Sequence, residues 1–140
     1  MAAIVTFWKV IDAKQKVSCV CTLVHRFFQQ AQRQLIAVPN QQVADYIDKL
    51  IWRFPKEGFV PHAVSSEPLQ AAVVITTSNE NVNNAGIVIN LCPSVTLLGP
   101  LVAQIHELYD TTDPAKEELS RQRKAEYEQQ GLTVSVCPWT

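Results

Sequence analysis

The fold of this chain is decided by residues 4–51, which read IVTFWKVIDAKQKVSCVCTLVHRFFQQAQRQLIAVPNQQVADYIDKLI. The β-branched and aromatic run at residues 4–10 predicts a strand, and the short apolar run at 35–38, stopped by Pro39, predicts a second one. Apolar residues recur at helical spacing over residues 17–31 and again over 43–51, where Asn40 is a suitable N-cap. This strand-helix-strand-helix order is typical of an α/β fold with a parallel sheet.

The rest of the chain continues the pattern. Residues 73–77 and 86–91 predict strands on either side of an Asn-rich turn. Pro114 is expected at the first position of a last helix, Gly131 just past its end, and residues 132–136 form a final strand. Residues 98–109 fit both a helix and a strand, because their apolar spacing is helical while their position suits a strand. We expect one domain over residues 1–140.

Composition excludes several classes of protein. With 140 residues, 47% of them hydrophobic and 18% charged, the chain is long and apolar enough to form a globular core. Its net charge of -1 does not favour direct binding to nucleic acid. No apolar run is long enough to cross a membrane and no signal peptide is evident, so a cytoplasmic protein is expected. The four cysteines lack the spacing of a zinc site and are interpreted as small buried hydrophobes.

The usual signatures of catalysis and nucleotide binding are missing from the sequence. The four glycines are far apart, so neither a dinucleotide fingerprint nor a phosphate-binding loop is predicted. His25, His62 and His106 do not have metal-ligand spacing, and no serine lies in a nucleophile-elbow pattern. Asp110 and Asp113 border a helix start, where acids are favourable. We therefore predict no catalytic residue, no metal and no cofactor.

Residues 52–62 are unusually rich in aromatic side chains and turn formers. We predict a loop here, because Pro55, Gly58 and Pro61 break regular structure. Large aromatic side chains in a constrained loop are good interface anchors, so Trp52 and Phe59 are candidate partner-binding residues. The alternative is that both rings simply cover the sheet.

Two segments resemble the chi subunit of bacterial DNA polymerase III holoenzyme. One is residues 52–62, most specifically the block Phe59-Val60-Pro61-His62, and the other is Arg121-Gln122-Arg123 followed by Tyr127 and Gly131. Together with the strands at 4–10 and 87–91, the resemblance spans nearly the whole chain. It implies a Rossmann-like three-layer α/β domain with a mostly parallel sheet and no phosphate-binding loop. It also implies that residues 102–108 are a strand.

The resemblance further implies an adaptor function. Chi proteins join the psi subunit, which connects to the clamp loader, and in some bacteria a repair helicase takes the same surface. Trp52 and Phe59 match that surface. Some chi proteins have an arginine on the last helix that helps to contact psi, whereas this chain has Glu128 there. This reversed charge disfavours the same partner surface.

Chi proteins also bind the acidic C-terminal tail of single-stranded DNA-binding protein, and Arg121 matches the arginine that receives it. A guanidinium suits a carboxylate because its donors form a planar fork. Lys116, Arg123 and Lys124 are expected to add positive potential, and Leu132, just past Gly131, to line an apolar pocket. Lys124 replaces a family aromatic residue and Val136 a threonine. Alternatively, Arg121 merely pairs with Glu117 on an exposed helix.

A second class of function stays open. The chain could be a small nucleotide- or substrate-binding enzyme on a degenerate α/β scaffold, and nucleotide-dependent thermal stabilisation would favour that hypothesis.

Overall fold

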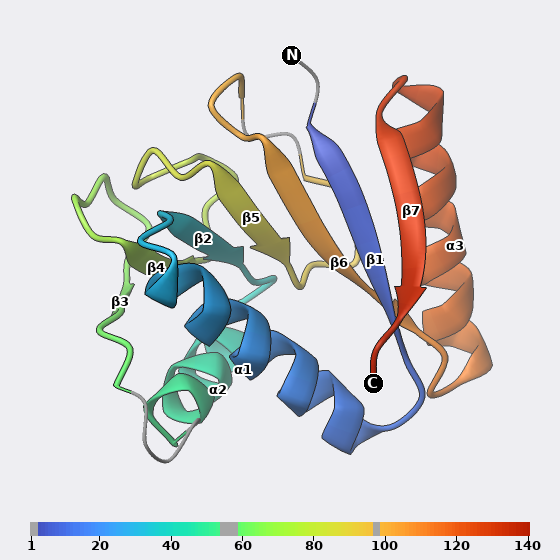
Figure 1. Ribbon diagram of the computed structural model, residues 1–140, viewed down its shortest axis with the longest axis horizontal. Helices are drawn as coiled ribbons and strands as arrows, with labels where there is room; N and C mark the ends of the chain where they lie inside the picture. The colour runs from blue at the N-terminus through green and yellow to red at the C-terminus, as the bar shows by residue number, and fades with distance from the viewer. Residues whose placement is uncertain (1–2, 54–58, 97–98) are drawn as a thin grey trace.

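The chain forms one seven-stranded sheet flanked by helices in a computed structural model that describes residues 3–53, 59–96 and 99–140 (Figure 1). All strand pairs are parallel, and the strand order is β3-β4-β2-β5-β6-β1-β7. The elements of the described residues are β1 (Ile4–Val10), α1 (Ala13–Gln29), β2 (Gln34–Ala37), α2 (Gln41–Arg53), β3 (Ala63–Val64), β4 (Val73–Thr76), β5 (Ile87–Asn90), β6 (Gln104–Asp110), α3 (Pro114–Gln129) and β7 (Thr133–Pro138).

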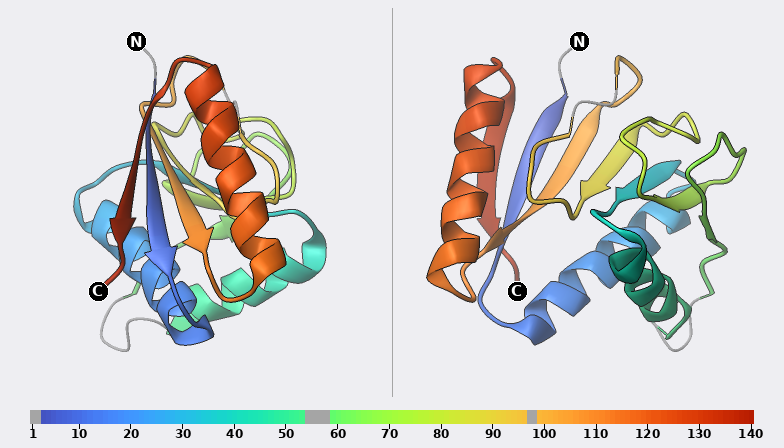
Figure 2. Two further views of the ribbon diagram at one scale, coloured as in Figure 1. Left: turned by 90° about the vertical axis from the view of Figure 1, so that its right-hand side faces the viewer. Right: turned by 180° about the vertical axis from the view of Figure 1, so that it is seen from behind.

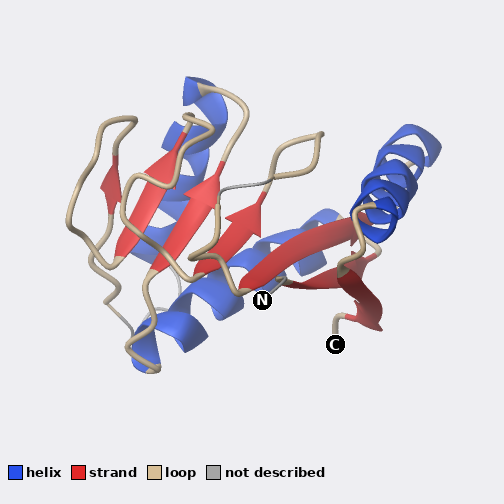
Figure 3. Cartoon of the chain, turned by 90° about the horizontal axis from the view of Figure 1, so that it is seen from above, coloured by secondary structure: helices blue, strands red, loops and turns tan. Residues whose placement is uncertain are grey.

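The sheet has two differently covered faces. Apolar side chains of α1 and α2 pack on one face against residues such as Ile36, Ile75 and Ile89. On the other face, Tyr127 of α3 packs against Val5 and Phe7. In Figure 3 the strands at one end of the sheet cross above α1 and α2, whereas α3 lies at the other end. The predicted α/β fold with three layers is therefore confirmed, and the sheet is parallel throughout.

The open assignment at residues 98–109 is resolved as strand β6, which covers Gln104–Asp110. β6 pairs with β5 on one side and β1 on the other, so its backbone is satisfied by neighbours on both edges. Leu98 lies outside the described residues. The two-residue strand β3 was not predicted from the sequence, because two residues carry no periodicity.

Helices α2 and α3 begin where Asn40 and Pro114 predicted, whereas α1 begins at Ala13, before the predicted span of 17–31. Asp12 caps α1, Asn40 caps α2 and Asp113 caps α3, and each accepts a hydrogen bond from a backbone N–H of the first turn. α1 follows β1 and α3 follows β6; these neighbouring strands thus send their helices to opposite faces of the sheet (Figure 2). In open parallel sheets such a switch point is where ligands bind, outside the carboxyl ends of the strands.

Candidate partner-binding surfaces

Trp52 and Phe59 lie side by side and are exposed. Their ring centroids are 5.2 Å apart, and the exposed fractions are 49% for Trp52 and 68% for Phe59. We call these two rings the aromatic surface. The loop predicted over residues 52–62 starts later in the structure. Trp52 still belongs to the last turn of α2, which ends at Arg53. Residues 54–58, including Pro55 and Gly58, lie outside the described residues.

The buried side chain of His62 supports the aromatic surface from the interior of the protein. Its ring centroid is 4.3 Å from that of Trp52, and its side chain is fully buried. Nε2 lies 2.8 Å from Oδ1 of Asp48, and Nδ1 lies 2.8 Å from the carbonyl oxygen of Val60. Asp48 and Trp52 are four residues apart on α2 and so share one face of the helix. The histidine therefore ties the chain after the loop to α2, a role that sequence reasoning had not assigned to Asp48 or His62.

The exposed face of α3 carries two of the predicted residues. The Arg121 side chain is 67% exposed and pairs with Glu118 of the same helix, not with Glu117 as the alternative interpretation had it. Lys124 lies one turn further on and pairs with Glu128 at 3.1 Å. Exposed pairs of this kind contribute little to stability. Arg121 and Lys124, with the Gly131-Leu132 turn beyond them, are called the α3 surface below.

Arg123 does not belong to the α3 surface, which corrects the expectation that it adds positive potential there. Its side chain is directed into the protein, where Nε donates to Oε1 of Glu107 at 3.0 Å. Nη2 donates to the carbonyl oxygen of Leu108 at 3.0 Å. Lys116 is not near Arg121 either, because it lies in the first turn of α3, on a different side of the helix, beside Asp113.

Glu107 is the centre of a buried polar network under α3. Tyr127 donates from its hydroxyl at 2.6 Å and Asn90 from Nδ2 at 2.7 Å, both to Oε2 of Glu107. Burial raises the pKa of the Glu107 carboxyl to about 7, although Arg123 and the hydrogen bonds from Asn90 and Tyr127 act in the opposite direction. Burial and Glu107 also raise the pKa of Tyr127, which keeps its hydroxyl a donor. The network holds α3 against β5 and β6.

The end of α3 has the geometry of a Schellman motif. Gly131 has a φ of +81°, its N–H donates to the carbonyl oxygen of Glu128, and the N–H of Leu132 donates to that of Tyr127. The predicted C′ position of Gly131 is thus confirmed. Leu132 is half-buried against the cluster that contains Tyr127.

β7 adds apolar side chains beside the α3 surface. Val134 and Val136 pair in register with Val5 and Phe7 of β1, so they point to the face of the sheet that α3 covers. Val136 remains 39% exposed there. Sequence reasoning did not assign Val134 to this apolar strip of β7. The alternation of residue types along the strand, with Val134 and Val136 on one face, would have indicated it.

The two surfaces lie at opposite ends of the sheet. α2 packs beside β3 and β4, whereas α3 packs beside β6 and β7, and Figure 1 and the right-hand view of Figure 2 show the separation. The structure therefore brings Trp52 next to Phe59 and puts Arg121 and Lys124 on one helix face. These two pairs of residues form separate surfaces. Glu128 lies on α3, away from the aromatic surface. Its charge therefore does not lie next to the aromatic rings, and its effect on a psi-like partner stays a prediction.

The described residues offer little for metal or thiol chemistry. They contain no group of three His, Cys, Asp or Glu side chains placed to hold a metal ion. Cys19 and Cys21 are buried, as predicted, and burial raises the pKa of Cys19 to about 12 and that of Cys21 to about 11. Cys92 and Cys137 are only half-buried. His106 accepts a hydrogen bond from Nε1 of Trp8 at 3.1 Å and lies in the core, as expected of a structural residue.

Comparison with known proteins decides the family. Residues 2–135 match the model of the DNA polymerase III chi subunit, HolC. The chain belongs to this family. It is 22% identical over 123 residues to DNA polymerase III subunit chi of Pseudomonas aeruginosa, covering 88% of this chain and 86% of that protein. It is 23% identical over 123 residues to DNA polymerase III subunit chi of Escherichia coli, covering 86% of this chain and 83% of that protein.

Family membership confirms the resemblance seen in the sequence and gives the chain an accessory role in DNA replication. None of the helices within the described residues has the length and apolar character needed to span a membrane.

Proposed function

We propose that this chi family member is a non-catalytic adaptor with two docking surfaces. The α3 surface binds the acidic C-terminal tail of single-stranded DNA-binding protein. The aromatic surface binds a clamp-loader subunit related to psi, or a repair helicase. Two surfaces at opposite ends of one rigid sheet allow both partners to be held at once, which is the geometry an adaptor requires.

The observation that carries the tail-binding role is the exposed guanidinium of Arg121 beside an apolar strip. Arg121 is held by Glu118, an exposed pair that a tail carboxylate can replace at small cost. Leu132 and Val136 provide apolar surface for a terminal hydrophobic side chain. Lys124 adds a second positive charge on the same helix face.

The sizes of the free-energy contributions indicate that the acidic tail binds weakly. A charge-assisted hydrogen bond contributes about 1.5–3 kcal/mol, and burial of one large apolar side chain contributes about as much. Association itself costs at least about 4 kcal/mol, so further contacts are needed for micromolar affinity. We expect a micromolar complex that weakens with added salt.

Calorimetry with a peptide copy of the host's single-stranded DNA-binding protein tail tests this role. Arg121→Ala is expected to weaken binding about tenfold or more, as loss of a charged hydrogen bond implies. Arg26→Ala is the matched control, because Arg26 is also an exposed helical arginine but lies on α1. Equal affinities for wild type and Arg121→Ala would remove Arg121 from the site.

The aromatic surface is supported by the way in which its rings are held. His62 and Asp48 fix Trp52 before any partner arrives, so little side-chain entropy is lost on binding. A pull-down from native cells with the double variant Trp52→Ala, Phe59→Ala should lose a partner that wild type retains. If the folded double variant recovers the same proteins as wild type, the rings have a structural role only.

Glu128 is expected to influence binding at the α3 surface. Because it lies on α3 and pairs with Lys124, it affects any partner that reaches the α3 surface. Glu128→Arg is expected to free Lys124 and to strengthen binding of the acidic tail peptide, since it replaces a negative charge by a positive one. An unchanged or weaker affinity would place the tail away from this end of α3.

A further inference from the structure

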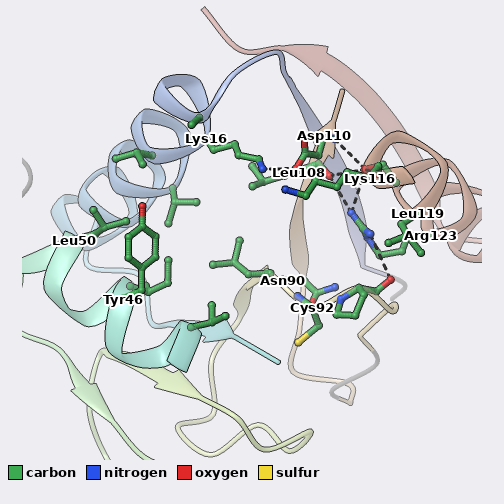
Figure 4. Close-up of a pocket in the computed structure, with 18 residues that line it drawn as sticks. Lys16, Tyr46, Leu50, Asn90, Cys92, Leu108, Asp110, Lys116, Leu119 and Arg123 are labelled. Carbon is green, nitrogen blue, oxygen red and sulfur yellow. Dashed lines mark hydrogen bonds and ion pairs between the residues drawn. The ribbon is translucent and has the colours of Figure 1, made fainter. Parts of the chain in front are cut away.

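A crevice of about 600 Å³ opens at the carboxyl ends of β5 and β6, between α1, α2 and α3 (Figure 4). Its lining is mainly apolar, and Leu91, Leu108 and Asp110 are part of it. It coincides with the switch point of the sheet, where β1 and β6 send their helices to opposite faces. None of the four residues Trp52, Phe59, Arg121 and Lys124 lines it, so it is distinct from both surfaces described above.

Each of the three helices presents one stripe with i, i+3, i+4, i+7 spacing to this crevice. The stripe of α1 consists of Ala13, Lys16, Val17 and Val20. The stripe of α2 consists of Val43, Tyr46, Ile47 and Leu50. The stripe of α3 consists of Lys116, Leu119, Ser120 and Arg123. Three helical stripes around one groove form walls into which the side-chain ridge of a further helix packs.

Large apolar side chains are left exposed at the rim. Tyr46 is 54% exposed and Leu119 is 40% exposed. Exposed apolar side chains that gather around a concave site mark an interaction surface more often than chance. The crevice therefore has the composition of a docking site, with an apolar base and an incompletely covered rim.

The charges of the lining residues are biased toward positive. Asp110 is the one acid among them, against Lys16, Lys116 and Arg123. Arg123 is neutralised by Glu107 beneath it, and Lys16 pairs with Asp110 at 2.7 Å. Lys116 is only loosely paired, with its Nζ 3.9 Å from Oδ2 of Asp113 and half of its side chain exposed. The α3 stripe thus contributes one weakly compensated ammonium group, that of Lys116.

The form of the occupant follows from the backbone around the crevice. β5 and β6 are each paired on both sides, so an extended peptide would find no free strand edge there for its main-chain groups. A helix satisfies its own backbone hydrogen bonds and needs only side-chain contacts. Phosphate is disfavoured, because the N-termini of α1 and α3 are already capped by the carboxylates of Asp12 and Asp113.

We propose that this crevice is a docking groove for an amphipathic α-helix of a partner protein, with an apolar stripe that enters the crevice and acidic residues that flank it near Lys116. The apolar stripe packs on the stripes of α1 and α2, and the acidic flank faces the first turn of α3.

A synthetic peptide tests the groove directly. The probe is about 18 residues long, so that it is measurably helical, with leucines at i, i+3, i+4 and i+7 spacing and glutamates beside them. We expect saturable binding to the full-length protein and no binding of a peptide with the same composition in scrambled order. Leu119→Glu is expected to weaken binding at least tenfold, because it puts a carboxylate on the apolar rim.

Leu69→Glu is the matched control. Leu69 is 38% exposed, close to the 40% of Leu119, but it lies outside the crevice, so this variant should bind the probe like wild type. Lys116→Glu tests the charge at the rim without touching the apolar base. It should weaken the glutamate-flanked peptide and strengthen a lysine-flanked one, and circular dichroism of each variant verifies that it is folded.

Several outcomes would overturn the proposal. Absence of probe binding, or binding that survives Leu119→Glu in a folded variant, excludes helix docking at this crevice. Stabilisation by decanoate without any binding of the peptide would make it a small-molecule site. A dimer in sedimentation that Leu119→Glu dissolves would assign the crevice to a second copy of the chain.

Discussion

Arg121 and Arg123, two residues apart on α3, point to opposite sides of the helix: Arg121 into solvent, and Arg123 onto Glu107, with its Nε 3.0 Å from Oε1. Residues two positions apart on a helix are about 200° apart around its axis, so when Arg123 faces the sheet, Arg121 faces solvent. The inward arginine fixes the helix, and the outward one is free to meet a ligand.

Replacement of Arg123 should therefore affect stability, whereas replacement of Arg121 should not. Arg123→Met leaves the Glu107 carboxylate buried without its charge partner, which typically lowers the free energy of unfolding by about 3–5 kcal/mol. Arg121→Met should change it by less than about 0.5 kcal/mol. Urea unfolding measures both. A similar effect of the two substitutions would mean that the buried ion pair does not hold α3.

His106 predicts a specific pH dependence of stability. Burial lowers the pKa of His106 to about 4, with the charge of Arg26 as a second cause, and Nδ1 already accepts from Trp8. In the unfolded chain the pKa is near 6.5, so below that pH the unfolded state binds the additional proton. The stability contributed by the neutral ring is complete above pH 6.5 and is lost as the pH falls toward 4, by about 3 kcal/mol in total.

The difference between wild type and His106→Gln isolates this contribution. Glu107, whose pKa is raised, acts in the opposite direction between about pH 4.5 and 7, but it is present in both proteins. We expect the stability advantage of wild type over His106→Gln to shrink by about 3 kcal/mol between pH 7 and 4. A pH-independent difference would contradict the assigned protonation state.

Substitution of Gly131 should lower the stability of the protein because of the backbone conformation of this residue alone. Its φ is +81°, and an added Cβ would meet nothing within 4 Å. Gly131→Ala should therefore cost about 1 kcal/mol through the left-handed conformation, and Gly131→Asn less. Gly86→Ala is the control, because Gly86 lacks a positive φ and its added Cβ would lie 3.8 Å from the nearest atom, the carbonyl oxygen of Leu101. Equal costs at both glycines would contradict this explanation.

Nucleotides should not stabilise the protein. The N-termini of α1 and α3 converge on the switch point, but Asp12 and Asp113 occupy them with negative charge. A thermal-shift screen with ATP, ADP and NAD, each with Mg²⁺, should leave the midpoint unchanged. A clear upward shift would favour the enzyme hypothesis over the adaptor.

Much of the fold was predictable because it is local. The helix starts at Asn40 and Asp113, the glycine after α3 and the apolar runs of the strands all depend on residues that are close together in the chain. The residues at 98–109 were not decided locally, since their strand state depends on pairing with β1 and β5, which lie far away in the sequence.

The sequence by itself determined the α/β class, the family and the candidate residues Trp52, Phe59 and Arg121. Only the tertiary structure decided which arginine of α3 is buried, because its partner Glu107 is 16 residues away. It also separated Glu128 from the aromatic rings and brought three helical stripes together around one crevice. The physical reason is that a local pattern fixes which face of an element is apolar, whereas the packing of the elements fixes what each polar side chain meets.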